Sequence, residues 1–92
     1  MYNYFMLIGK KKGLKKLDEN FYELSLEVVR PFREADGTFK SDEFKIKCSH
    51  WMLFEGENTL NNVKTLSVTG RCVPTDNGVE LIANKMMIMG EN

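Results

Sequence analysis

The stretch at residues 44–49, Phe-Lys-Ile-Lys-Cys-Ser, alternates apolar and polar side chains at every position. A period of two is typical of a β-strand, because successive side chains point to opposite faces of a sheet. We therefore predict a strand that turns its three apolar side chains into a core. Its outer face carries Lys45 and Lys47, and continuing the alternation places Trp51 on that same face.

Four more segments have the composition of strands, and turn signals separate them. We predict these strands at residues 2–8, 21–30, 65–73 and 79–89. Asp36-Gly37 is typical of an exposed hairpin tip within 33–41, and Asn77-Gly78 is typical of a tight hairpin. Gly70 indicates a bulge or bend inside its strand. Residues 55–63 allow about two turns of helix at most, since they lack a convincing apolar stripe.

Five strands with at most one short helix, between the third and the fourth, suit a small closed barrel. Closure removes the exposed edges that an open five-stranded sheet would present. The fold class that we predict is all-β: a five-stranded Greek-key barrel of the OB-fold type. A chain of 92 residues has room for one such core, so residues 1–92 are predicted to form a single domain.

The charge of the chain is balanced overall and uneven locally. Thirteen basic residues offset thirteen acidic ones, but residues 10–16 carry five lysines and no acid. A local basic cluster is sufficient for contacts with phosphates. Because the first predicted strand closes at Gly9, we expect this lysine run to lie in the first loop between strands. The alternative is a solvated loop with no binding role.

The sequence offers little for catalysis. Its only histidine, His50, and its two cysteines show no metal-ligand spacing, and there is no glycine-rich phosphate loop. We expect Cys48 and Cys72 to be reduced, buried thiols of a cytoplasmic protein. No apolar run approaches the length of a membrane span. The prediction is a binding protein with no enzymatic activity, no metal, no cofactor and no small-molecule substrate.

Several motifs, in their order along the chain, resemble those of the bacterial single-stranded DNA-binding protein family. Residues 3–10 (NYFMLIGK) are similar to its opening strand, and residues 24–32 (LSLEVVRPF) to its second strand and exit. Residues 46–51 (IKCSHW) resemble the third strand, which often ends in Trp. Residues 68–71 (VTGR) resemble the fourth strand, and residues 80–85 (ELIANK) the start of the last. The shared order extends the resemblance over nearly the whole chain.

The resemblance implies a protein that binds single-stranded DNA with little sequence preference, in replication, recombination or repair. It implies base stacking for Trp51 and a phosphate contact for Lys47. It also implies a homo-oligomer, either a dimer or a tetramer, for which the apolar residues 1–8 are suited. The expected setting is the cytoplasm, at the nucleoid, for a bacterial or phage protein.

Three features depart from the family pattern. The region after Trp51 is compressed, the loop before the last strand is reduced to a tight turn at residues 76–78, and no acidic tail is found near Asn92. The long form of that loop carries basic and aromatic contacts in the family, so we expect weaker binding here. The chain therefore resembles a short, divergent member or a truncated form.

Binding a strand without reading its sequence needs cations near phosphates and flat rings on which bases stack. The predicted contacts are Trp51, Lys47, Lys45, Phe32, Arg30, Arg33, Phe39, Lys40, Lys10 and Lys12. Alternatives are a subunit interface for Trp51, a plug of the barrel end for Phe32, and stacking on its own hairpin for Phe39. Two other functions stay open: an OB-fold protein-interaction subunit with weak nucleic-acid affinity, and an RNA-binding OB module.

Overall fold

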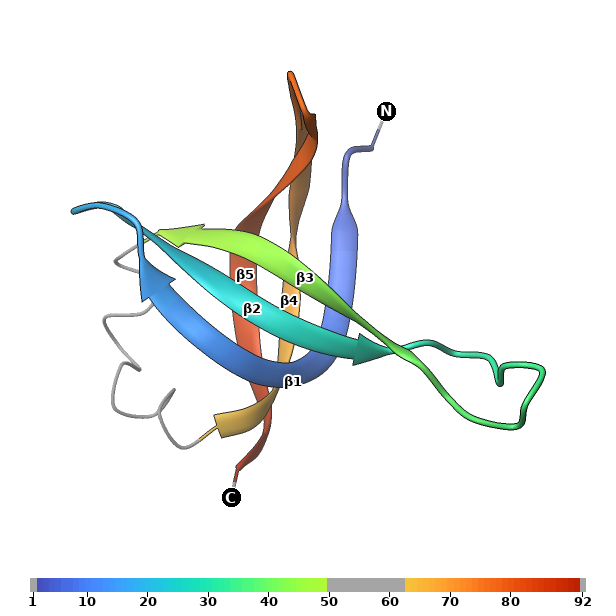
Figure 1. Ribbon diagram of the computed structural model, residues 1–92. Coiled ribbons are helices and arrows are strands. Elements are labelled where there is room, and N and C mark those ends of the chain that lie inside the picture. The colour runs from blue at the N-terminus through green and yellow to red at the C-terminus, as the bar shows by residue number, and fades with distance from the viewer. Residues whose placement is uncertain (1, 50–62, 92) are drawn as a thin grey trace.

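Five strands close into a barrel in the computed structural model, which describes residues 2–49 and 63–91 (Figure 1). The strands are β1 (Phe5–Lys16), β2 (Phe21–Val29), β3 (Ser41–Ser49), β4 (Val63–Thr75) and β5 (Gly78–Glu91). Their order around the barrel is β1-β2-β3-β5-β4, and only the β3–β5 pair is parallel. The predicted five-stranded OB-type barrel is confirmed. The expected short helix at 55–63 and Trp51 lie outside the described residues.

The prediction for the lysine run was wrong, because residues 10–16 belong to β1 rather than to a loop. The first half of β1 pairs with β4 and the second half pairs with β2, so one long strand serves both sides of the barrel. Gly9 lies between the two halves, where an added Cβ would overlap the carbonyl oxygen of Glu27. Gly9 therefore permits two strands to approach closely. It does not end the first strand, as the sequence had suggested.

The turns follow the sequence signals closely. The tip of the 30–40 segment turns at Gly37, whose φ of +88° lies in the left-handed region that favours glycine. The carboxylate of Asp36 accepts hydrogen bonds from the backbone N and Oγ1 of Thr38 at 3.0 and 2.6 Å. At the other hairpin, Thr75 pairs directly with Gly78 across a two-residue turn. The bulge at Gly70 is confirmed by a register shift between Thr69 and Gly70.

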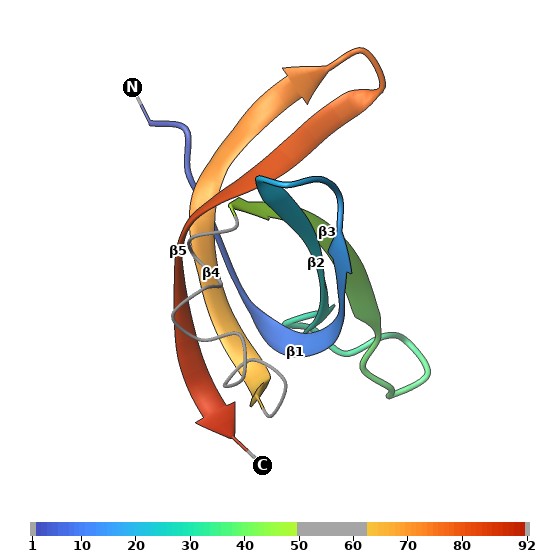
Figure 2. The same ribbon diagram turned by 90° about the vertical axis from the view of Figure 1, so that its left-hand side faces the viewer.

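Two segments extend away from the barrel body, as Figure 2 shows. One is the β4–β5 hairpin, and the other is the connection between β2 and β3, residues 30–40, which we call the arm. Within residues 2–49 and 63–91, no helix is long and apolar enough to cross a membrane.

The core of the barrel consists of apolar side chains from β2, β3, β4 and β5. The buried members are Leu24, Leu26, Ile46, Cys48, Leu66, Val68 and Ala83. The alternation predicted for β3 is confirmed, since Ile46 and Cys48 are fully buried and Phe44 packs against the same cluster. Full burial of a Leu, Ile or Val side chain contributes about 1.5–3 kcal/mol. The inside of the barrel therefore supplies the stability, and the outer faces can carry other chemistry.

Candidate nucleic-acid interface

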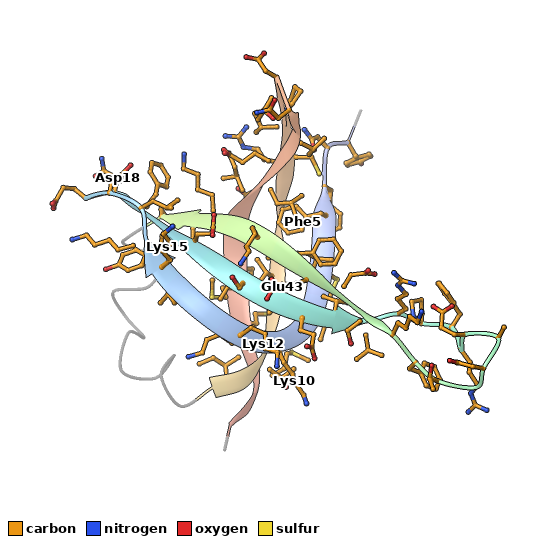
Figure 3. All side chains as sticks on the ribbon, in the orientation of Figure 1. Phe5, Lys10, Lys12, Lys15, Asp18 and Glu43 are labelled. Atoms are coloured by element: carbon orange, nitrogen blue, oxygen red, sulfur yellow. The ribbon has the colours of Figure 1, made fainter. Side chains whose placement is uncertain are left out.

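The outer surface of β1, β2 and β3 gathers five lysines. Residues directly opposite each other on neighbouring strands share a face. In the register, Lys15 lies opposite Glu23, which lies opposite Lys47, and Gly13 lies opposite Ser25, which lies opposite Lys45. We call this surface the lysine face; its lysines are Lys10, Lys12, Lys15, Lys45 and Lys47. Figure 3 shows the first three along the curve of β1.

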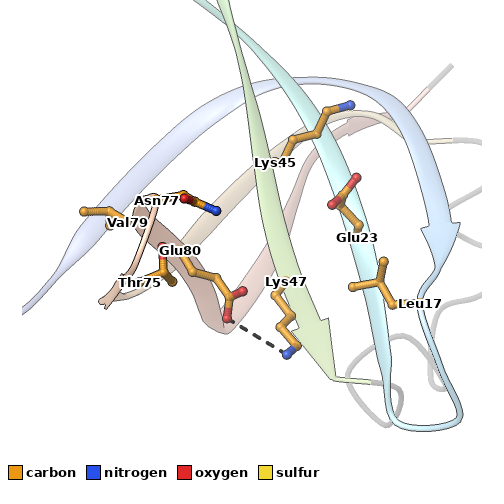
Figure 4. A pocket seen from close by; sticks show the side chains of 8 residues that line it. All are labelled: Leu17, Glu23, Lys45, Lys47, Thr75, Asn77, Val79 and Glu80. Carbon is orange, nitrogen blue, oxygen red and sulfur yellow. Dashed lines mark ion pairs between the residues drawn. The ribbon is translucent and has the colours of Figure 1, made fainter.

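A groove of about 320 Å³ runs between the lysine face and the β4–β5 hairpin (Figure 4). Its lining residues are Leu17, Glu23, Lys45, Lys47, Thr75, Asn77, Val79 and Glu80. Leu17 comes from the β1–β2 turn, where its backbone N donates to the carbonyl oxygen of Phe21 at 3.0 Å. In OB-folds, the β2–β3 face together with the β1–β2 and β4–β5 loops binds oligonucleotides. The groove thus occupies the ligand position of this fold.

Lys47 lies at the edge of the groove and has two neighbours. Its Nζ is 4.4 Å from the centroid of the Phe21 ring and 3.9 Å from Oε1 of Glu80. Sequence reasoning did not select Phe21, although the residue begins β2 opposite Ser49 and therefore shares the outer face. The available signal was its position in the alternation, two residues before Glu23. Phe21 adds a half-buried aromatic ring to the lysine face.

Lys45 and Lys12 are also engaged within the lysine face. The Nζ of Lys45 donates to Oγ of Ser25 at 2.7 Å and lies 3.5 Å from Oε2 of Glu43. The Nζ of Lys12 lies 3.6 Å from Oε2 of Glu27. Lys10 and Lys15 form no ion pair with any residue in the described part of the chain. Four of the five predicted lysines are therefore brought together with Lys15, which was not predicted as a contact, and three of these four have acidic neighbours.

Arg30, predicted as a DNA contact, lies at the base of the arm and pairs with two carboxylates. Its Nε and Nη2 donate to the two carboxylate oxygens of Asp42 at 3.1 and 3.0 Å, and its Nη1 donates to Glu34 at 3.0 Å. These hydrogen bonds lower the pKa of Asp42 and raise the pKa of Arg30. Bidentate pairing suits the planar guanidinium, so this side chain fastens the base of the arm. The predicted DNA contact of Arg30 stays a prediction.

The arm presents the remaining predicted contacts to solvent. Phe32 is 56% exposed, which excludes the alternative of a buried plug at the barrel end. Phe39 is 55% exposed and lies 5.4 Å, centroid to Cζ, from the guanidinium of Arg33. Phe39 therefore stacks on its own hairpin through Arg33, and the residue still keeps more than half of its surface exposed. Lys40 is exposed next to it.

A second outer face, formed by β1, β4 and β5, is apolar. We call it the methionine face; it carries Tyr4, Met6, Ile8, Met87 and Met89, each more than 40% exposed. These side chains form two rows, one from residues 4–8 and one from β5. Ser67 and Thr69 of β4 lie between the rows, since Ser67 pairs with Ile8 on one side and with Met87 on the other. A hollow of about 260 Å³ lies there, lined by Tyr4, Met6, Ser67, Thr69, Lys85 and Met87. Contiguous exposed apolar surface of this kind marks interaction sites.

The cysteines offer no activated nucleophile. Burial raises the pKa of the Cys48 thiol to about 12, so the thiolate is not populated at neutral pH. Cys72 is a free, half-buried thiol whose backbone exchanges two hydrogen bonds with the side chain of Asn3, at 2.6 and 2.8 Å. Among residues 2–49 and 63–91, no three His, Cys, Asp or Glu side chains form a group that could hold a metal ion.

No family model and no curated protein matches this sequence. Among solved structures, a small single-stranded DNA-binding protein from Mycoplasma pneumoniae matches 100% of this chain and 99% of its own, with a TM-score of 0.75 and 16% identity. The dimeric N-terminal domain of the PriB protein from Thermoanaerobacter tencongensis matches 97% and 98%, with a TM-score of 0.66 and 22% identity. A small single-stranded DNA-binding protein from Streptomyces coelicolor matches 100% and 95%, with a TM-score of 0.65 and 11% identity. The chain therefore shares its fold, over nearly its full length, with small bacterial single-stranded DNA-binding proteins.

Proposed function

We propose that this chain binds single-stranded DNA without strong sequence preference, and that it protects exposed strands in replication, recombination or repair in the bacterial cytoplasm. The observation that carries the proposal is the groove of about 320 Å³, which brings Lys45 and Lys47 to the ligand position of an OB-fold. The fold shared with small single-stranded DNA-binding proteins agrees with it.

Each group on the lysine face has a separate part in this proposal. Lys45 and Lys47 contact phosphates at the groove, and Lys10, Lys12 and Lys15 extend the positive track along β1. Stacking a base on an aromatic ring contributes about 1–3 kcal/mol, so few rings suffice. The resemblance assigns this stacking to Trp51, which lies outside the described residues. Phe21 offers a second ring beside Lys47.

The arm extends the same path at the opposite end of β2 and β3. The groove lies near the start of β2, and the arm begins where the nine residues of β2 end. A strand of this length spans about 30 Å at roughly 3.3–3.4 Å per residue. OB-folds bind about 4–16 nucleotides each, which matches a path of this length. In this proposal Phe32, Phe39, Arg33 and Lys40 form the far end of the binding track.

We also propose that the chain assembles into a homodimer or homotetramer through the methionine face. Two rows of exposed apolar side chains flank a row of small hydroxyl side chains there, which lets a second surface approach closely. The largely apolar stretch at residues 2–8 contributes one of the two rows through Tyr4, Met6 and Ile8.

A comparison of two single-lysine variants tests the binding site. The fluorescence of Trp51, the sole tryptophan, should quench when oligo-dT is added at low salt and recover as salt rises. Lys47→Ala should weaken this binding about threefold to tenfold, because it removes a cation from the groove. Lys85→Ala removes the same charge from the methionine face and should leave the affinity within about twofold.

The same titration separates the proposed function from its alternatives. No quenching, together with no shift of the oligonucleotide on a gel, would favour a protein-interaction subunit with weak nucleic-acid affinity. Equal affinity for oligo-U would favour the RNA-binding module, since a stacking platform does not by itself exclude a 2′-hydroxyl. Equal loss in Lys47→Ala and Lys85→Ala would show that the lysine face is not the binding surface.

A further inference from the structure

The lysine face carries almost as many carboxylates as lysines. Its five lysines are accompanied by four glutamates: Glu23, Glu27, Glu43 and Glu80. Three lysine–glutamate pairs lie within 4 Å, at 3.6 Å for Lys12–Glu27, 3.5 Å for Lys45–Glu43 and 3.9 Å for Lys47–Glu80. The surface that should attract a polyanion is thus close to neutral.

These carboxylates are not needed to hold the barrel together. The side chains of the three pairs are between 31% and 55% exposed, and exposed ion pairs contribute little to stability. Glu80 lines the groove from β5 and meets a lysine of β3, far from it in sequence. Both side chains line the groove, so a phosphate that reaches Lys47 there would meet the carboxylate of Glu80, whose Oε1 is 3.9 Å from Lys47 Nζ.

This inference rests on the proposed function. We propose that Glu80 limits and tunes the affinity of this site for single-stranded DNA, because its carboxylate neutralises Lys47 in the free protein, as a phosphate would in the complex. Binding of a strand then exchanges a carboxylate for a phosphate at Lys47. A lysine that is already neutralised releases fewer counterions when a phosphate arrives, so the salt dependence is shallow. Affinity at this end of the groove comes mainly from base stacking, which requires unpaired bases.

Glu80→Gln tests the proposal with a nearly isosteric change. At about 20 mM salt, where screening is weak, this variant should bind oligo-dT about fivefold more tightly than the parent. The gain should fall below about twofold at 0.5 M salt. The slope of log K against log salt should steepen by about 0.3–0.5, a part of the roughly 0.7 that one full additional phosphate contact contributes on a single strand.

Three further variants locate the effect. Glu19→Gln removes the same charge in the β1–β2 turn, where Glu19 neither lines the groove nor pairs with a described residue, and should change the affinity less than twofold. In a Lys47→Ala background, Glu80→Gln should no longer tighten binding, because the two residues act as a pair. Glu43→Gln, which releases Lys45, should give a smaller gain of the same sign.

The outcomes separate this inference from the proposed function. If the parent chain binds oligo-dT and Glu80→Gln binds no tighter, or if Glu19→Gln gives an equal gain, the inference about Glu80 is wrong and the binding function stands. If neither the parent nor Glu80→Gln binds oligo-dT at any salt concentration, both are overturned.

Discussion

The two halves of β1 share the core and have opposite surface chemistry. In the first half, the outer positions are Met6 and Ile8, next to β4; in the second half, they are Lys10, Lys12 and Lys15, next to β2, with a register shift between Lys11 and Gly13. Leu7 in the first half and Leu14 in the second both pack against the core. One strand therefore supplies a shared core and divides the outer surface into the methionine face and the lysine face.

Because of this division, the proposed assembly and the proposed DNA binding should be separable by mutation. The methionine face has the composition of a protein interface, rich in exposed Met and Tyr. The lysine face has cations, an aromatic ring at Phe21 and a groove. Gly9 lies at the boundary between them, where an added Cβ would overlap the backbone of β2.

The largest effect, a loss of stability, is expected for Gly9→Ala at that boundary. A Cβ there overlaps the carbonyl oxygen of Glu27, so backbone must shift and both faces change together. Forcing extra volume into a packed site costs about 1–3 kcal/mol, which lowers the melting temperature by about 4–8 °C per kcal/mol in a domain of this size. Circular dichroism during heating measures the melting temperature.

Gly13→Ala is the matched control, because a Cβ at this position of the same strand has no heavy atom within 4 Å. Its melting temperature should stay within about 4 °C of that of the parent chain, given that unconstrained surface changes stay within about 0.5 kcal/mol. Equal destabilisation by the two substitutions would mean that Gly9 marks no close contact between the strands.

A smaller, one-sided effect is expected for Met87→Lys. The substitution places a charge on the methionine face and should weaken self-association at least about tenfold, measured by sedimentation equilibrium. Binding of oligo-dT per protomer should change less than twofold. Val29→Lys, at an exposed apolar position on β2, should leave association unchanged. A parent chain that is monomeric at all concentrations would contradict the proposed assembly.

The smallest effect is expected at the arm, with Asp42→Asn. Because pairing with Arg30 lowers the pKa of Asp42 below 3.8, the pair stabilises the fold above pH 3.8, and this stability is lost as the pH falls through the lowered pKa. The melting temperature of the parent chain should therefore be slightly higher than that of the variant at pH 7, and the difference should stay the same down to about pH 5. The difference should vanish in stronger acid. Asp76→Asn, which removes a carboxylate that pairs with no described residue, should show no such pH dependence.

Local patterns predicted the parts of the molecule that depend on neighbouring residues. The alternation at 44–49 placed Ile46 and Cys48 in the core and Lys45 and Lys47 outside, because strand geometry alone decides which face a side chain takes. The two hairpin turns were also readable, since Gly37 and Gly78 adopt positive φ, which favours glycine.

The sequence by itself determined that five strands close into a barrel, where the two hairpin turns lie and which face of β3 turns inward. Only the tertiary structure decided that residues 10–16 form a strand, that Arg30 is held by Asp42, and that Lys47 meets both Phe21 and Glu80. The physical reason is range: a β-strand needs partners, and the partners of β1 come from β2 and from β4 far along the chain. Ion pairs between strands likewise depend on register and closure, which no local pattern records.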